Sequence, residues 1–301
     1  MATSMRALRL HERGGADRIV FEDAPVPAPA IGDVLVQVDA ASITPTELGW
    51  PSTWVDRTGA DRTPVIPSHE LCGTVVGLGY GTSGFAPGDE VFGLTDWYRD
   101  GAAAELVAVE ARNLARKPAR CTSIEAASLP LAALTAWQAL FDHGGLTRDD
   151  TVVVTGATGG VGVFALQLAA AAGARVVAIA RADRADAARE LGATEVVTAD
   201  DEGWVRALGA VDLVADFVGG SLLDTLVKGA GVKRAVSVVA PGDGVDFFVV
   251  EADRPALTEL ARRVDAGVLR PVVGEVVPLA DGARAFGTGL RPIGKRIIAV
   301  R

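Results

Sequence analysis

One segment constrains the fold of this chain more than any other: a short apolar strand runs directly into a glycine-rich turn, and an alanine-rich helix follows. The strand is predicted over 151–155, and the helix runs to Ala172 with Gly173 as its C-cap. Glycines in the turn let the backbone bend tightly and approach a pyrophosphate, whose charge is met by N–H groups at the helix N-terminus. The pattern predicts a dinucleotide site, although glycines also serve turns that only pack. The residues expected at the cofactor are Gly156, Ala157, Thr158, Gly159, Gly160, Val161 and Gly162.

The texture of the chain changes twice along its length. Up to about residue 118, short β-branched runs are separated by glycine and proline, and strand texture returns after about residue 267. Between them, a helical stretch over 123–141 is followed by compact strands alternating with helices, as in parallel βαβ units. These strands are expected at 151–155, 175–180, 195–197, 211–216 and 234–239. We therefore expect an α/β fold, with a doubly wound parallel Rossmann sheet at 123–267 inserted between the β-rich pieces 1–122 and 268–301.

The choice between NADH and NADPH is read at the end of the second strand of such a unit, where an acidic side chain would bind the ribose hydroxyls of NAD. Here the strand ends at Ala180 without an acid, and Arg181 and Arg184 follow. Guanidinium groups are planar donors that suit a 2′-phosphate. The sequence favours NADPH, with two solvated arginines as the alternative and with Asp183 weakening the signal.

Charge and composition exclude several classes of function. The formal net charge of −9 disfavours binding to nucleic acid or to anionic membranes. Two cysteines, Cys72 and Cys121, cannot build a disulfide framework, and the first residues lack the apolar core of a signal peptide. The longest apolar stretch, 164–180, contains polar residues and is too short to span a membrane. We expect a cytoplasmic protein with no nucleic acid or membrane partner.

The glycine turn also fits the pattern of short-chain dehydrogenases, T-G-x-x-x-G-x-G. Those enzymes need a catalytic tyrosine, with lysine four residues later, downstream of the turn. Both tyrosines of this chain, Tyr80 and Tyr98, precede the turn and have Gly84 and Ala102 at the fourth place. That family is excluded.

Eight segments, among them the glycine turn and spread over nearly the whole chain, point to another family: Ala40–Glu47, Pro67–Gly73, Phe85–Val91, Leu129–Trp137, Thr155–Gly162, Leu191–Ala193, Asp216–Gly220 and Gly294-Lys295. With them the chain resembles the medium-chain dehydrogenase/reductase superfamily, in its zinc-free quinone oxidoreductase branch. The resemblance implies a GroES-like catalytic β domain, an NADPH-binding Rossmann domain and a cleft between them. It also implies a homodimer, with 247–250 as a possible edge strand for the contact.

The zinc sites of related alcohol dehydrogenases are not matched. Two cysteines cannot supply the four-cysteine lobe of the second zinc. At the place of the first catalytic cysteine stands Thr44, a poor zinc ligand, and the helix after residue 129 offers no third ligand. One departure is His69-Glu70, which resembles the zinc branch. We expect no metal, and a zinc-dependent alcohol dehydrogenase with unusual ligands stays as an alternative.

Without a Lewis acid, hydride addition to an electrophilic acceptor is easier than alcohol oxidation. The expected activity is reduction of a quinone or an α,β-unsaturated carbonyl, in which the protein orients the cofactor and keeps the site dry. The resemblance puts Thr44 where its hydroxyl could bind the acceptor oxygen, although it could equally serve a turn before Pro45. His69 either lines the cleft or forms a hydrogen bond at a strand start.

Aromatic residues in loops are candidates for the substrate pocket. Trp50, Trp54 and Trp97 lie where large rings have little reason to sit unless they bind a planar ring or pack on the edge of the core. Tyr98 is a possible proton donor. By resemblance, the nicotinamide side of the cofactor site is lined by Thr135, Val218, Gly219, Ala240, Phe248 and Val249.

Two other functions stay open. The resembled superfamily contains enoyl reductases acting on carrier- or CoA-bound substrates, which would need a long entry groove with basic residues. It also contains catalytically weak NADPH-binding proteins such as lens crystallins. Turnover of NADPH with simple acceptors distinguishes these from the expected reductase.

Overall fold

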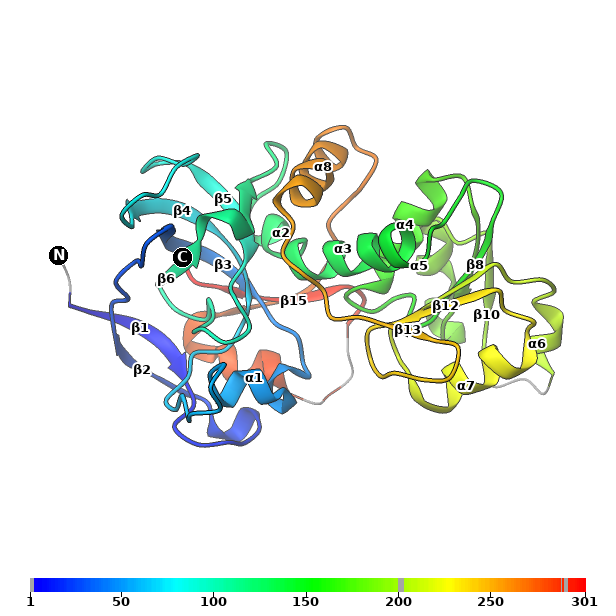
Figure 1. Ribbon diagram of the computed structural model, residues 1–301, viewed down its shortest axis with the longest axis horizontal. Helices are drawn as coiled ribbons and strands as arrows, with labels where there is room; N and C mark the ends of the chain where they lie inside the picture. The colour runs from blue at the N-terminus through cyan, green and yellow to red at the C-terminus, as the bar shows by residue number, and fades with distance from the viewer. Residues whose placement is uncertain (1–2, 200–202, 288, 290–291) are drawn as a thin grey trace. The chain divides into compact units, whose positions relative to one another are not determined.

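The computed structural model describes residues 3–199, 203–287, 289 and 292–301, and its chain divides into two compact units (Figure 1). The first, here called the β unit, comprises Met1–Leu131, Ala252–Asp265 and Val273–Arg301. The second, the α/β unit, comprises Ala132–Glu251 and Ala266–Val272. The chain therefore leaves the β unit after Leu131 and returns to it twice.

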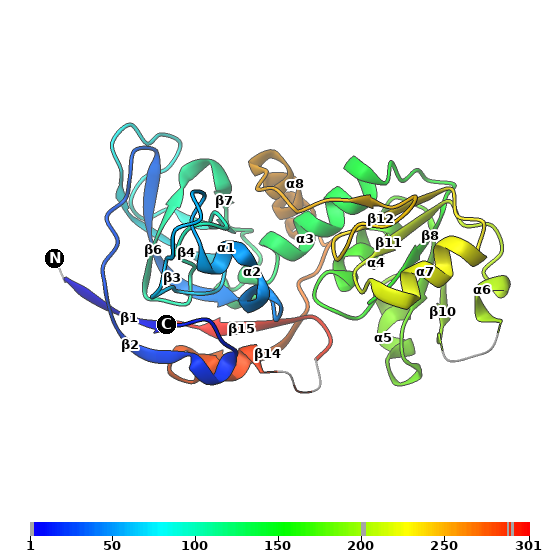
Figure 2. The same cartoon turned by 60° about the horizontal axis from the view of Figure 1, so that its bottom comes forward.

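The β unit is built on a seven-stranded sheet in the order β14-β15-β3-β4-β5-β7, with β6 paired to β3. Figure 2 shows its last two strands, β14 and β15, side by side. A separate two-stranded sheet is formed by β1 (Ser4–Arg9) and β2 (Val20–Pro25). The strands of the large sheet are β3 (Asp33–Ser42), β4 (Glu70–Leu78), β5 (Glu90–Leu94), β6 (Leu106–Glu110), β7 (Leu114–Arg116), β14 (Val273–Pro278) and β15 (Lys295–Ala299). The strand texture predicted after residue 267 corresponds to β14 and β15.

Alternating apolar residues hold this sheet together. Val34, Val36 and Val38 of β3 are fully buried in one core cluster that also takes in Ile298 of β15. At Gly73 of β4, a Cβ atom would lie 2.1 Å from the Gln37 carbonyl oxygen of β3, so only glycine permits this approach. The helices of the unit are α1 (Pro51–Trp54), α2 (Ser123–Ala127) and α8 (Arg254–Asp265).

The α/β unit contains a six-stranded parallel sheet in the order β10-β9-β8-β11-β12-β13. The order reverses between β8 and β11, which is the topological switch point of a doubly wound sheet. The predicted Rossmann sheet is thereby confirmed. Its strands are β8 (Thr151–Val154), β9 (Arg175–Ile179), β10 (Glu195–Val197), β11 (Leu213–Asp216), β12 (Arg234–Ser237) and β13 (Asp246–Phe247).

The helices that follow strands in the α/β unit are α4 (Gly162–Ala171), α5 (Ala185–Glu190), α6 (Trp204–Ala207) and α7 (Gly220–Gly229). Most of α3 (Pro130–Trp137) also lies in this unit and precedes β8. Val205 of α6 and Leu223 and Leu226 of α7 pack on Val153 and Val214 of the sheet. No helix among the residues described is long and apolar enough to cross a membrane.

The stretch 123–141, predicted as one run of helix, is divided. A capping box between Thr122 and Glu125 begins α2, and α3 (Pro130–Trp137) begins at a proline, which is favoured at a first helical position. The chain then continues as a π-helical segment, Gln138–His143. Helical periodicity alone did not reveal these breaks.

Two buried glutamines hold late segments of the chain to the α/β unit. The Gln138 amide donates to the Glu251 carbonyl at 2.9 Å and accepts from its N–H at 3.1 Å. The Gln167 amide pairs in the same way with Arg270, at 3.1 and 2.9 Å. Both ends of the excursion 252–265 are thus fixed by side chain to backbone pairs.

Candidate functional site

The glycine turn of the α/β unit has the shape expected of a pyrophosphate cradle. Gly156 adopts a φ of +57°, and the Gly159 N–H donates to its carbonyl at 2.8 Å. A Cβ at Gly162 would lie 2.2 Å from the same Gly156 carbonyl oxygen, so a side chain there would break the turn. Within the described chain no side chain caps the N-terminus of α4. These features fit a bound dinucleotide, because backbone N–H groups at this helix end stay available to an anion.

The other residues predicted in this turn differ in their exposure. Gly159, Gly160 and Val161 are half-buried, whereas Ala157 and Thr158 are buried. The half-buried backbone of 159–161 is therefore the part of the turn that a ligand can approach.

The two arginines after β9 have different surroundings. Arg184 is half-buried, and its Nη1 lies 3.5 Å from Oγ1 of Thr158 in the glycine turn. Arg181 is exposed, and its guanidinium forks onto the Asp183 carboxylate with two contacts of 3.0 Å. Arg184 is placed beside the turn, while Arg181 is engaged by its acidic neighbour.

The residues predicted along the nicotinamide side lie at several places in the α/β unit. Gly219 is buried with a φ of +73°, and the neighbouring Val218 is 49% exposed. Phe248 stacks on the His143 ring with 4.1 Å between ring centroids, whereas Val249 is 62% exposed. Thr135 is buried in α3 and Ala240 is half-buried after β12.

In the β unit the structure brings together three of the predicted residues. The His69 ring is stacked with Trp50 at 6.5 Å and meets the edge of Trp97 at 5.2 Å. The two tryptophans contact each other edge to face at 5.5 Å. Trp50 and Trp97 are half-buried, so part of each ring can meet a ligand. We call Trp50, His69 and Trp97 the aromatic cluster.

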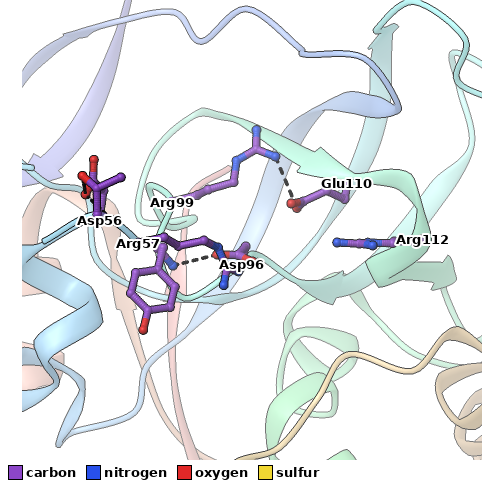
Figure 3. A pocket seen from close by; sticks show the side chains of 8 residues that line it. Asp56, Arg57, Asp96, Arg99, Glu110 and Arg112 are labelled. Carbon is purple, nitrogen blue, oxygen red and sulfur yellow. Dashed lines mark hydrogen bonds and ion pairs between the residues drawn. The ribbon is translucent and has the colours of Figure 1, made fainter. Parts of the chain in front are cut away.

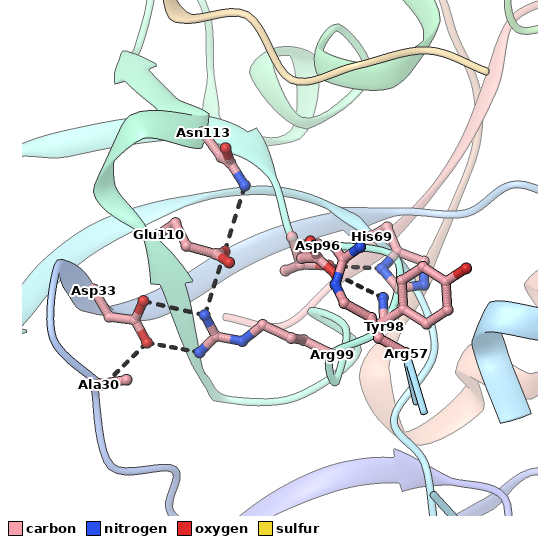
Figure 4. Close-up of polar contacts among 10 residues, drawn as sticks. Ala30, Asp33, Arg57, His69, Asp96, Tyr98, Arg99, Glu110 and Asn113 are labelled. Atoms are coloured by element: carbon pink, nitrogen blue, oxygen red, sulfur yellow. Dashed lines mark hydrogen bonds and ion pairs between the residues drawn. The ribbon is translucent and has the colours of Figure 1, made fainter. Parts of the chain in front are cut away.

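His69 is held neutral in this cluster. Its Nδ1 lies 2.7 Å from the Thr95 hydroxyl, and its side chain is almost fully buried (Figure 4). Burial, helped by the nearby Arg62 cation, lowers the pKa of His69 to about 4. At neutral pH the imidazole is uncharged and offers its second ring nitrogen to hydrogen bonding.

Trp54, Thr44 and Tyr98, which were also predicted at the site, lie outside the aromatic cluster. Trp54 is 3% exposed, packs with Leu10 and Val65, and donates its indole N–H to the Leu48 carbonyl at 2.9 Å. Its ring belongs to the core. Thr44 is half-buried at the turn before α1, where its carbonyl accepts from the Glu47 N–H at 2.9 Å.

Tyr98 lines a pocket of about 610 Å³ in the β unit (Figure 3). The Arg57 guanidinium lies 4.6 Å from the centre of its ring and also pairs with Asp96. Arg99 in the same pocket contacts the buried Asp33 and the half-buried Glu110 (Figure 4). The lining residues are Asp56, Arg57, Thr58, Asp96, Tyr98, Arg99, Glu110 and Arg112. Most of their charges are thus paired within the pocket.

Near Thr44 and His69 the β unit also buries three ionisable side chains to which the sequence assigned no role. Lys295 of β15 pairs with Glu70 of β4 and donates to the Ile43 carbonyl at 3.0 Å. Glu70 also accepts from the Leu131 N–H at 3.0 Å. Burial raises the pKa of Glu47 to about 8, and no partner of its Oε1 is found in the described chain. The motifs carrying these residues were visible, but their pairing across 225 residues was not.

Family models match both parts of the chain. A model described as alcohol dehydrogenase GroES-like domain matches residues 30–119, and one described as zinc-binding dehydrogenase matches 160–261. The mouse protein named NAD(P)H oxidoreductase RTN4IP1, mitochondrial, is 31% identical over 84% of this chain and 78% of its own length. This chain belongs to the medium-chain dehydrogenase/reductase superfamily. Its N-terminal domain is GroES-like, as the resemblance implied.

Other members of the superfamily refine this assignment. The Arabidopsis thaliana chloroplast envelope quinone oxidoreductase homolog is 34% identical over 87% of this chain and 74% of its own length. The solved structure of the quinone oxidoreductase from Coxiella burnetii superposes with a TM-score of 0.89 at 25% identity, covering 99% of this chain and 100% of the other. The chain falls in the quinone oxidoreductase-like branch and is an oxidoreductase that uses a nicotinamide cofactor, NAD(P)H.

The prediction of a cytoplasmic protein is contradicted by these relatives. The mouse protein and a 34% identical zinc-binding oxidoreductase of Arthroderma benhamiae are named mitochondrial, and the Arabidopsis relative is named for the chloroplast envelope. The expectation rested on the two cysteines, on first residues without an apolar signal-peptide core and on the lack of a membrane-spanning stretch. None of these features bears on import into organelles, which amphipathic segments direct.

One family model is named for zinc binding, so the side chains that could ligate a zinc ion are of interest. In the part of the chain that the structure describes, no three His, Cys, Asp or Glu side chains are grouped to hold a metal ion. Nδ1 of His69 is engaged by the Thr95 hydroxyl, and His69 and Cys72 have no third donor grouped with them in the described chain. A catalytic zinc takes three protein ligands, so this set does not fit one.

Proposed function

We propose that this oxidoreductase is an NADPH-dependent reductase of quinones or α,β-unsaturated carbonyls that works without a metal. The observation that carries the proposal is the replacement of a ribose-binding acid by Arg184, held beside Thr158 of the glycine turn. The names of the quinone oxidoreductase relatives support the acceptor class. We further propose 1–122 and 268–301 as the catalytic domain and 123–267 as the cofactor domain, of which 123–131 and 252–265 pack in the β unit.

The α/β unit would hold the cofactor by its phosphates. The N–H groups at the start of α4 have no side-chain cap and would bind the pyrophosphate. Arg184 would bind the 2′-phosphate, and Arg181 would exchange Asp183 for it. When bound, the nicotinamide would supply a hydride. The residues of the chain would bind and orient the nicotinamide ring.

The aromatic cluster of the β unit would bind the acceptor. Trp50 or Trp97 can stack on a planar quinone or enone, and His69 beside them is uncharged at neutral pH. Hydride addition leaves an oxyanion or enolate that takes one proton. The Thr44 hydroxyl or water is proposed to stabilise that oxygen, and Tyr98 is the other candidate donor.

The cofactor part is tested by replacing both arginines with alanine. We expect kcat/KM for NADPH to fall by ~10–100-fold while that for NADH changes little, because the lost contacts are to the 2′-phosphate. Arg189→Ala is the matched control, since Arg189 is exposed in α5 and pairs with Asp186. Equal use of NADH and NADPH by the unaltered protein would refute NADPH selectivity.

The acceptor part is tested with EDTA-treated protein, a simple benzoquinone and a simple enone. Trp50→Ala and Trp97→Ala should raise KM for the acceptor by roughly 10-fold with little change in NADPH binding. Trp54→Ala serves as the contrast: it should lower the free energy of unfolding by about 3–5 kcal/mol because its ring is core. Activity lost to EDTA and restored by zinc would contradict metal independence.

A homodimer is proposed through the edge strand β13. Phe247 on this edge is 40% exposed and Val249 just beyond it is 62% exposed. An edge with exposed apolar side chains favours pairing with a second copy. Sedimentation of the unaltered protein and of Phe247→Asp tests it: a dimer that the substitution converts to monomer is expected.

A further inference from the structure

Asp216, the last residue of β11, is a fully buried carboxylate whose hydrogen bonds come from neutral groups. The hydroxyls of Thr155 and Ser237 each donate to it at 2.7 Å. The Gly219 N–H lies 3.0 Å from both of its oxygens, and the Val218 N–H lies 3.3 Å from one. Among the described residues it forms no ion pair. A buried carboxylate surrounded by four neutral donors is costly to keep unless the arrangement it imposes is used.

The three side chains of this network stand at the carboxyl ends of neighbouring strands. Thr155 directly follows β8, Asp216 ends β11, and Ser237 ends β12. The pair β8 and β11 is the switch point of the sheet, and dinucleotides bind in the crevice at that edge. Asp216 therefore ties together the strand ends around the expected position of the cofactor.

The network also fixes the loop that follows β11. Thr155 Oγ1 accepts from the Phe217 N–H of this loop at 2.9 Å, and in the loop after β12 Ser237 Oγ accepts from the Val239 N–H at 3.1 Å. The loop lies against the glycine turn, because a Cβ at Gly156 would be 3.0 Å from a methyl of Val218. The next residue, Gly219, has a φ of +73°, a conformation its two contacts with Asp216 hold.

We propose that Asp216 is a positioning residue that holds the loop 217–219 where the nicotinamide half of the cofactor binds. The proposal rests on the proposed NADPH site and adds a division of labour to it. Arg181 and Arg184 serve the adenosine half, and Asp216 serves the nicotinamide half through Val218 and Gly219. It touches neither the cofactor nor the acceptor itself.

The test compares two ligands on one variant. Asp216→Asn keeps the shape but places an NH₂ donor against donors, so the loop must shift. We expect NADPH to bind ~10-fold more weakly, while adenosine 2′,5′-bisphosphate, which lacks the nicotinamide half, binds as to the unaltered protein. Binding is measured by calorimetry without an acceptor, so the result does not depend on turnover.

Asp212→Asn is the matched control. Asp212 directly precedes β11, at the amino-terminal end of the strand, opposite to the end that holds Asp216. There it accepts from the Thr151 N–H at 2.8 Å and pairs with Lys233. This variant should bind both ligands normally. A loss of NADPH affinity as large as that of Asp216→Asn would overturn the assignment.

Other outcomes also decide the proposal. Equal weakening of both ligands by Asp216→Asn, or no weakening of either, overturns it. If that variant does not fold, Ser237→Ala removes one donor and should weaken NADPH selectively by a smaller factor, and an unselective effect refutes the proposal. If the unaltered protein binds NADH as well as NADPH, NADPH selectivity fails, and NADH against adenosine 5′-monophosphate then tests Asp216 independently.

Discussion

The two units bury carboxylates by opposite means. In the α/β unit, Asp216 is satisfied by hydroxyl and N–H groups that the ends of adjacent strands bring to it. In the β unit, Glu70 is satisfied by the cation of Lys295, which arrives on a strand 225 residues later. Several neutral donors share the stabilisation of Asp216, so that each contributes a part of it. Removing one partner of a buried ion pair leaves the other charge uncompensated and costs much more.

Glu47 shows a third outcome in the β unit. One of its oxygens accepts from the Ser68 N–H at 3.2 Å, and the other has no partner among the described residues. Burial is the main cause of its raised pKa of about 8, and the nearby Lys295 cation opposes it. At neutral pH this carboxyl therefore keeps its proton, whereas the Glu70 carboxylate is paired with Lys295.

The largest effect is expected where a cation is removed from the β unit. Lys295→Met leaves the buried Glu70 charge without its partner and should lower the free energy of unfolding by about 3–5 kcal/mol. Urea unfolding followed by tryptophan fluorescence measures it. Adding Glu70→Gln should recover much of the loss, since the amide oxygen still accepts from Leu131. A loss under 1 kcal/mol for the single variant would show that the pair is not a stability element.

A smaller effect is expected from deleting one neutral donor in the α/β unit. Thr155→Val removes a hydroxyl bonded to Asp216 and to the Phe217 N–H, at a cost of about 1–3 kcal/mol. The same urea experiment compares it with Lys295→Met. Thr155→Ser, which keeps the hydroxyl, is the control. A cost as large as that of Lys295→Met would remove the difference between the two units.

Glu47 predicts a pH dependence confined to a known window. Its pKa of about 8 in the folded chain exceeds the ordinary 4.5, so the folded state binds the proton more tightly. This contribution is complete below pH 4.5 and is lost as the pH rises through 8. Between pH 6.5 and 8 the unaltered protein should lose roughly 1–2 kcal/mol relative to Glu47→Gln.

The window above pH 6.5 also separates Glu47 from His69. The pKa of His69 is lowered to about 4 from 6.5, so its contribution to stability is present above pH 6.5 and lost as the pH falls toward 4. Parallel stability profiles of the unaltered protein and Glu47→Gln from pH 6.5 to 8 would show that Glu47 is ionised in the folded chain.

The smallest effect is expected at the surface of the α/β unit. Asp183→Ala frees the exposed Arg181 from its ion pair, and such pairs contribute about 0–1 kcal/mol. NADPH should bind up to ~5-fold more tightly, with adenosine 5′-monophosphate unaffected. Calorimetry at low and moderate salt measures the gain, which should shrink with salt. Weaker binding would mean that Asp183 orients Arg181 instead of competing for it.

The sequence predicted the α/β unit well because its signals are local. The strand predicted at 195–197 is β10 itself, and those predicted at 151–155 and 175–180 end one residue later than β8 and β9. Alternating strands and helices carry their own periodicity, and the glycine spacing marks the turn. Pro130 was visible inside the predicted helix 123–141, but its role as a helix start depends on the turn before it.

The candidate site could be predicted only in part, because much of it depends on long-range contacts. Periodicity does not place Trp54 in the core and Trp50 beside His69, since the two residues stand at either end of the same short helix, α1. In the sequence, Asp216 stands out only as the first residue of the segment Asp216–Gly220. The one local signal for its burial is that an acidic residue ends an apolar strand. No local sequence pattern indicates that Lys295 pairs with Glu70, because the two residues lie 225 positions apart.

The position of β15 in the β unit has a consequence for synthesis on the ribosome. This strand pairs with β3 and buries Ile297 and Ile298, yet Ser42 of β3 and Arg296 of β15 lie 254 residues apart. At ordinary translation rates β3 waits on the order of ten to fifty seconds for its neighbour. The residues of α/β unit are all translated within that interval. During it the nascent β unit exposes an open strand edge, which is the surface that holding chaperones recognise.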